Sequence, residues 1–89
     1  MDKDKAADNL WRARHLIQSV TKTGEYATSG TVGHADALLR FDGDQYALIT
    51  SLSQAIERLK KATALLEIVR YDVTVARSLA SQEEQHEGG

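Results

Sequence analysis

Apolar residues recur at helical spacing through the second half of the chain, and this pattern predicts one long helix over residues 46–81. Two rows each repeat every seven residues, and they alternate at steps of three and four. This is the pattern of a heptad-repeat helix that packs against another helix. One row is large and the other is mostly alanine, so a partner helix could approach closely along the alanine row. Together the rows form a predicted self-association seam: Leu48, Leu52, Ala55, Leu59, Ala62, Leu66, Val69, Val73 and Ala76.

Local signals predict where this helix begins and how far it continues. Ser51 and Gln54 have the spacing of a capping box, which predicts a start near Ser51 at the latest; Asp44 is an alternative N-cap that would start the helix earlier. Neither Gly nor Pro occurs between residues 45 and 82. Alternating β-branched residues at 71–75 could instead form a strand. We favour the helix, because no turn residue separates this segment from the helical pattern before it.

A second amphipathic pattern predicts a first helix over residues 4–23. Asp8 and Arg12 have the spacing of a favourable ion pair on this helix, and Gly24 is its expected stop. The apolar positions recur at steps of four and three and again mix alanine with larger side chains: Ala6, Leu10, Ala13, Ile17 and Val20.

The segment between these two helices allows more than one interpretation. Residues 25–33 are rich in Thr, Ser and Gly and predict a loop. Residues 34–41 fit a short helix, or the first arm of a β-hairpin that turns at Asp42-Gly43 and returns along residues 45–50. We favour the helix, because the apolar residues do not alternate. The predicted fold is therefore all-α: an antiparallel helical hairpin with a short middle helix (or hairpin). Residues 1–82 form a single helical domain and residues 83–89 a polar, disordered tail.

The length of the main helix predicts self-association. A helix of roughly 30 residues is about 45 Å long, whereas a compact domain of this chain length has a diameter of roughly 30 Å. The rest of the chain is too short to cover the whole seam. We therefore expect a homodimer or higher homo-oligomer, assembled as a helical bundle.

Charge and composition limit the classes of partner that we expect this chain to bind. The chain has 11 basic and 13 acidic residues, a net charge of −2, so we do not expect nucleic-acid binding. It has no cysteine, which excludes disulfides and thiol chemistry. Its charged start lacks the apolar core of a signal peptide, and the longest uncharged run, residues 45–56, is too short and polar to span a bilayer. These features predict a cytoplasmic protein with no membrane partner.

Two groups of residues could bind a ligand. The first helix carries Arg12, Arg14 and His15 beside Trp11, a cluster that could contact a phosphate or stack on a base. The loop carries Gly30, Gly33 and His34, and its backbone N–H groups could hold an anion. Each group also has a simpler interpretation, which we favour: a solvated helix face for the first and a flexible connector for the second.

Signals for catalysis or metal binding are weak. The segment Asp42-Gly43-Asp44 lacks the further oxygen ligands of a calcium loop, and the three histidines lack zinc-ligand spacing. We expect no enzyme activity, no cofactor and no metal. The function we favour is a small non-catalytic adaptor, regulator or inhibitor that binds an unidentified protein partner through a helix face. The alternative is a binder of a small anionic ligand or nucleotide, formed by the loop at residues 30–34 and the Arg12/Arg14 face.

Overall fold

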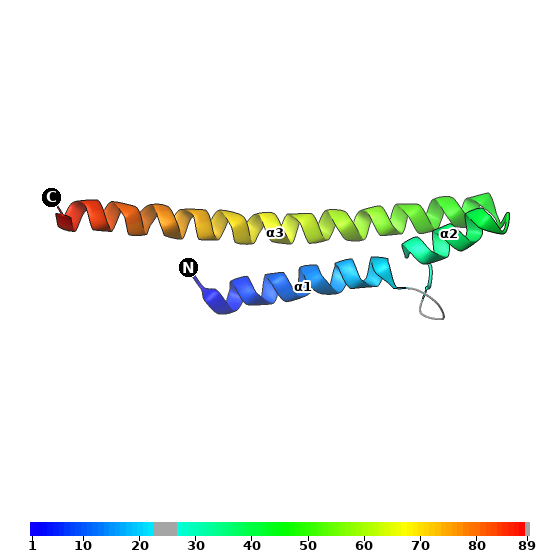
Figure 1. The fold of residues 1–89 in the computed structure, drawn as a ribbon, viewed down its shortest axis with the longest axis horizontal. Helices are drawn as coiled ribbons and strands as arrows, with labels where there is room; N and C mark the ends of the chain where they lie inside the picture. Colours follow the sequence, from blue (N-terminus) through cyan, green and yellow to red (C-terminus); the bar gives the residue numbers. More distant parts are fainter. Residues whose placement is uncertain (23–26, 89) are drawn as a thin grey trace.

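The protein is an elongated assembly of helices. The computed structural model describes residues 1–22 and 27–88, and within these it contains three helices and no strand: α1 (Lys3–Thr21), α2 (Val32–Arg40) and α3 (Gln45–Gly88). The molecule measures 69 × 19 × 15 Å, and its length follows α3 (Figure 1). The all-α prediction is confirmed.

Helix α1 begins at an aspartate cap. The side chain of Asp2 accepts hydrogen bonds from the backbone N–H groups of Asp4 (3.0 Å) and Lys5 (3.1 Å), which have no partner within the helix. The predicted ion pair between Asp8 and Arg12 is present at 3.5 Å on the exposed face. The predicted end at residue 23 and the stop at Gly24 lie outside the described residues.

The middle segment forms the short helix that the sequence favoured, and the β-hairpin alternative is wrong. Thr31 caps α2 by accepting from the His34 backbone N–H at 3.1 Å. After α2 ends, the Gly43 N–H donates to the Leu38 carbonyl at 2.7 Å, and Asp42 adopts a positive φ of 50°. The Asp42-Gly43 turn therefore joins two helices, because the segment before it has helical rather than alternating apolar spacing.

Helix α3 begins at the earlier of the two predicted caps. Asp44 accepts from the backbone N–H groups of Tyr46 (3.2 Å) and Ala47 (3.3 Å). This start agrees with the prediction that the helix begins near Ser51 at the latest. Ser51 itself does not cap the helix, since it lies within α3 and is fully buried. The strand alternative at residues 71–75 is wrong, because α3 continues through it to Gly88. The predicted division of the chain at residue 82 stays a prediction.

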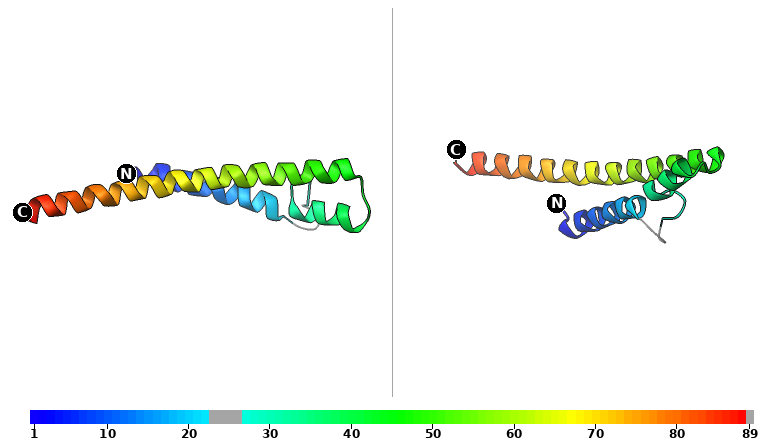
Figure 2. Two further views of the ribbon diagram at one scale, coloured as in Figure 1. Left: turned by 90° about the horizontal axis from the view of Figure 1, so that it is seen from above. Right: turned by 45° about the vertical axis from the view of Figure 1, so that its right-hand side comes forward.

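Helices α1 and α3 pack side by side through small residues. They run in opposite directions, and α3 extends beyond the N-terminal end of α1 (Figures 1 and 2). The contact row repeats every seven residues on both helices, which lets the two backbones approach closely. Its buried members are Ala6, Ala13 and Val20 on α1 and Ala55, Ala62 and Val69 on α3.

Helix α2 lies beside the first turns of α3 (Figure 2). The loop before α2 is fastened to α3 by hydrogen bonds: the Gly30 N–H donates to the Ser51 hydroxyl at 3.0 Å, and Ser29 donates to Gln54 at 2.7 Å. The Ser51/Gln54 pair that predicted a capping box thus holds the loop instead. Both side chains can bind the loop because they lie inside α3, where the backbone N–H groups already have helical partners and need no capping side chain.

Candidate protein-interaction surfaces

The predicted seam divides into two rows with different surroundings. The alanine row packs against α1, and its three central side chains are 6%, 2% and 9% exposed: Ala55, Ala62 and Val69. The large row is 42–46% exposed and comprises Leu52, Leu59, Leu66 and Val73. The two end residues, Leu48 and Ala76, are half-buried.

The row of residues that is buried next to the alanine row is not the large row of the predicted seam. In the predicted seam a large residue stands four positions after each member of the alanine row up to Val69. The side chains that accompany this row against the rest of the chain instead stand three positions after its members. These positions are buried or half-buried: Ser51, Arg58, Leu65 and Asp72. A heptad pattern permits both steps, and the interior step was missed because three of these four residues are polar.

The large row belongs to a second heptad pattern, which we call the outer stripe. It comprises Ile49, Leu52, Ile56, Leu59, Thr63, Leu66, Arg70 and Val73. Ile49 and Ile56 are 61% and 51% exposed, and neither was assigned to the seam from the sequence. Steps of three and four that start at Ile49 would have revealed them. An exposed, largely apolar strip of this length, broken only by Thr63 and Arg70, is unusual on a monomeric protein.

Two shallow hollows interrupt the outer stripe at the small residue Thr63. One has a volume of about 320 Å³ and is lined by Ile56, Leu59, Lys60, Thr63, Ala64 and Glu67. The other has a volume of about 210 Å³ and is lined by Thr63, Leu66, Glu67 and Arg70. Hollows of this kind receive side chains of a partner helix in knobs-into-holes packing.

The loop proposed to hold an anion uses its backbone groups within the fold. The Gly30 N–H donates to Ser51, its carbonyl accepts from the Arg58 guanidinium at 3.0 Å, and the His34 N–H donates to Thr31. Gly30 has a φ of +89°, and a Cβ placed there would lie 2.6 Å from the Arg58 Nη1 atom. The glycine therefore allows the loop to approach α3 closely. Gly33, like His34, is half-buried.

The two groups of predicted ligand-binding residues lie apart. The loop docks near Ser51 and Arg58, whereas Arg12 and His15 lie across from Lys61 and residues 64–68. Along the axis of α3, Lys61 lies about 15 Å from Ser51 and about 5 Å from Arg58. Arg14 is exposed and does not line the cavity that Arg12 and His15 share. The cavity that Arg12 and His15 line includes no residue of the loop, and a joint anion site stays a prediction.

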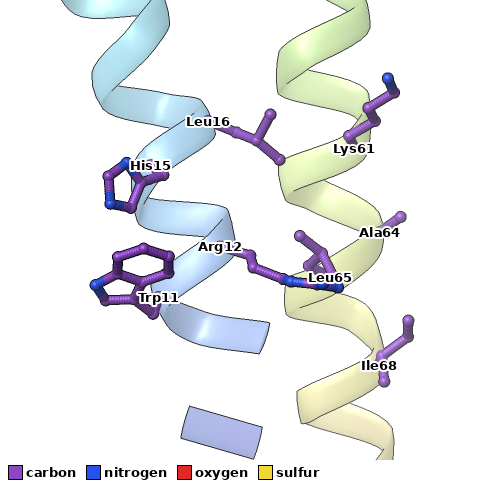
Figure 3. Close-up of a pocket in the computed structure, with 8 residues that line it drawn as sticks. All are labelled: Trp11, Arg12, His15, Leu16, Lys61, Ala64, Leu65 and Ile68. Carbon is purple, nitrogen blue, oxygen red and sulfur yellow. The ribbon is translucent and has the colours of Figure 1, made fainter. Parts of the chain in front are cut away.

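Arg12 and His15 instead contribute to a groove between α1 and α3, which we call the Trp11 groove. It has a volume of about 490 Å³ and is lined by Trp11, Arg12, His15, Leu16, Lys61, Ala64, Leu65 and Ile68. Trp11 and His15 stand together on the α1 wall with ring centroids 4.0 Å apart. Figure 3 shows Leu16 and Leu65 between the helices and the Arg12 side chain extending toward α3. The sequence identified the α1 wall of this groove but not the α3 wall.

The remaining features that the sequence raised do not form a metal site or a membrane span in the part of the chain that the structure describes. Asp44, part of the weak calcium signal, caps α3. Within the described residues, no three His, Asp or Glu side chains gather as a metal site would require. No helix in the same part of the chain is both long and apolar enough to cross a membrane. Tyr71, in the second half of α3, is 69% exposed.

Comparison of the chain with protein-family models, with curated proteins and with solved structures found no match. The inference of function therefore depends on the surfaces of the molecule itself. Two of these surfaces combine exposed apolar side chains with hollows: the outer stripe and the Trp11 groove.

Proposed function

We propose that this protein is a small, non-catalytic adaptor or regulator that pairs with a second copy of itself and presents a helical surface to a protein partner. The observation that carries the proposal is the outer stripe, whose large apolar side chains are 42–61% exposed in the single chain. Such a strip is stabilised when a second helix covers it. The helix that covers the outer stripe is α3 of a second copy of this chain.

The length and apolar content of the outer stripe suit a stable dimer. From Ile49 to Val73 it extends about 36 Å along α3. Burying the exposed half of a Leu, Ile or Val side chain stabilises an interface by about 1 kcal/mol. Six such side chains from each chain give about 12 kcal/mol, within the range of about 4–15 kcal/mol that association costs. Polar and rim contacts then contribute to the net affinity.

Two charged residues favour an antiparallel arrangement with two-fold symmetry. Lys60 and Glu67 both directly follow large residues of the outer stripe, Leu59 and Leu66, and so lie along the same flank. In an antiparallel helix pair this flank meets its own copy, so Lys60 of each chain faces Glu67 of the other. A parallel pair would place this flank against the opposite one, where Ala55 and Ala62 are buried by α1. Lys60 and Glu67 of the two chains therefore face each other only in the antiparallel arrangement.

The same arrangement gives a four-helix bundle. Helix α1 adds two exposed apolar side chains, Leu10 (47%) and Ile17 (39%), which follow the buried Ala6 and Ala13 by four residues. On two antiparallel helices this offset lies on the edge occupied by Leu59 and Leu66, which follow the alanine row by four. Two copies paired along this edge would bring both α1 helices beside the joined α3 helices.

The oligomeric mass of the protein tests the proposal. We expect light scattering over a dilution series to give twice the chain mass of 9.8 kDa, with dissociation only at low concentration. Lys60→Glu should weaken the dimer, and the double variant Lys60→Glu/Glu67→Lys should restore it because the facing charges are exchanged together. A wild-type protein that stays a monomer at every concentration would refute the self-association. A dimer that the double variant does not restore would refute the antiparallel register.

A further inference from the structure

We propose that the Trp11 groove is the docking site for an amphipathic helix of a partner protein, with acidic residues on both flanks of its apolar face. The inference rests on the proposed function, since it takes the protein to act by helix-face recognition, and it adds the site and the chemistry of the partner. The groove and the outer stripe are different surfaces and can be tested separately.

The Trp11 groove lies on the edge of the helix pair opposite the outer stripe. Its residues Arg12, Lys61 and Ile68 directly precede members of the buried contact row between α1 and α3, which are Ala13, Ala62 and Val69. The outer stripe residues instead follow that row by one or by four positions. On two antiparallel helices the groove positions and the stripe positions face opposite sides. A dimer formed through the outer stripe therefore leaves the groove of each chain open to a second partner.

The shape of the groove suits a helix better than a small molecule. Leu16 and Leu65 form its floor between the two helices, and Ala64 and Ile68 continue the apolar surface along α3 (Figure 3). The groove is an open channel between α1 and α3, so a small apolar ligand bound in it would keep much of its surface in water. An amphipathic helix needs cover on one face only and would add a third helix to the pair.

The charges on the two walls indicate which helix would fit. Arg12 stands on the α1 wall, where its partner Asp8 lies 3.5 Å away in an exposed pair, and Lys61 stands on the α3 wall. A partner helix between them would gain from carboxylates on both sides of its apolar face. Trp11, 59% exposed at the rim, and Arg12 are also of the residue types most often found as energetic anchors of interfaces.

A pair of designed peptides tests this site. Both would be helices of about 18 residues, with Leu at positions i, i+3, i+4 and i+7; one would carry Glu and the other Lys on both flanks of the apolar face. Trp11 is the only tryptophan, so its emission reports on the groove directly. We expect the Glu peptide to bind with a Kd below about 100 µM, to shift Trp11 emission to shorter wavelength, and to bind about tenfold more tightly than the Lys peptide.

A charge-reversed variant decides whether the binding is specific. In Arg12→Glu/Lys61→Glu the preference should reverse toward the Lys peptide, whereas the control Arg14→Glu/Arg77→Glu, with the same change in charge outside the groove, should keep it. Absence of binding below about 100 µM, or a preference that both double variants change equally, would overturn the proposal. So would a Trp11 emission shift with dodecanoate but not with the Glu peptide, because that would identify a small amphiphile as the ligand.

Failure of the groove is distinguishable from failure of the dimer. The same peptide titration on the stripe variant Thr63→Glu, which we expect to be monomeric, should give an unchanged affinity. If that variant loses peptide binding, the peptide occupies the outer stripe and the groove proposal is overturned, while the mass measurements on the wild type still decide the dimer.

Discussion

Thr63 sits in the middle of the outer stripe, and substitutions there should change self-association in opposite directions. Its side chain is exposed, donates to the Leu59 carbonyl at 2.9 Å and lines both hollows of the stripe. The proposed contact between Lys60 and Glu67 of the other chain places the two-fold axis close to Thr63, since this residue lies midway between them. In the dimer, the two copies of residue 63 would therefore be neighbours.

Thr63→Glu should dissociate the dimer and leave the fold of each chain intact. The two carboxylates would repel each other by about 3 kcal/mol at a separation of about 6 Å and an effective dielectric constant of about 20. Removing them from water would cost at least a few kcal/mol more. Together these terms exceed about 5 kcal/mol and raise the dimer Kd more than about a thousandfold. Within one chain the new Glu would change helix stability by only about 0.5 kcal/mol through Glu67 and Lys60.

Thr63→Leu should tighten the dimer, because it places an apolar side chain at the centre of the stripe, where the two hollows leave space. Two leucines buried at the axis would add about 3 kcal/mol, or about a hundredfold in affinity. Analytical ultracentrifugation of both variants, with Ser78→Glu as an exposed control on α3 beyond the stripe, would measure these changes. Equal masses for Thr63→Glu, Thr63→Leu and wild type would refute the assignment of the stripe as an interface, provided that circular dichroism shows all three to be folded.

Two further predictions concern the single chain and use urea unfolding as the assay. Ala13 is 1% exposed between α1 and α3, so Ala13→Leu should destabilise the protein by about 1–3 kcal/mol through overpacking; Ala7→Leu on the exposed face of α1 should change the stability little, and equal effects would contradict the close helix contact. Ser51 is fully buried and accepts from the Gly30 N–H, so Ser51→Ala should cost about 1–3 kcal/mol by leaving that donor unpaired. The exposed Ser53→Ala is its control, and an equal loss there would show that the loop contact contributes nothing.

The helices could be predicted from the sequence because their signals are local. Apolar spacing and the absence of Gly and Pro predicted α1 and α3, and Asp44 was recognised as one of two possible caps. The choice between Asp44 and Ser51 could not be made locally, because both have cap-like spacing. It depends on a distant contact, since the loop at Gly30 needs an acceptor from α3 and Ser51 supplies it.

The surfaces were harder to predict because heptad spacing alone does not say which flank of an alanine row faces its own chain. Steps of three and of four residues from Ala55 lead to Arg58 and Leu59, and composition favours the leucine. In the structure Arg58 turns toward the Gly30 carbonyl and is half-buried, so Leu59 remains exposed. The groove residues on α3 were missed for a related reason, since the wall opposite Trp11 is formed only when the two helices meet.

The distribution of small and large side chains connects the fold to its proposed assembly. The buried apolar residues that the structure describes are mainly alanines with two valines, whereas most of the large side chains of α3 are partly exposed. Burial of alanine removes less apolar surface from water than burial of leucine or isoleucine, so contact between α1 and α3 gives a chain this small only modest stability. The large side chains can contribute fully only when a second molecule covers them. Self-association should therefore add to the stability of a chain that already folds by itself, so that the free energy of unfolding rises with protein concentration.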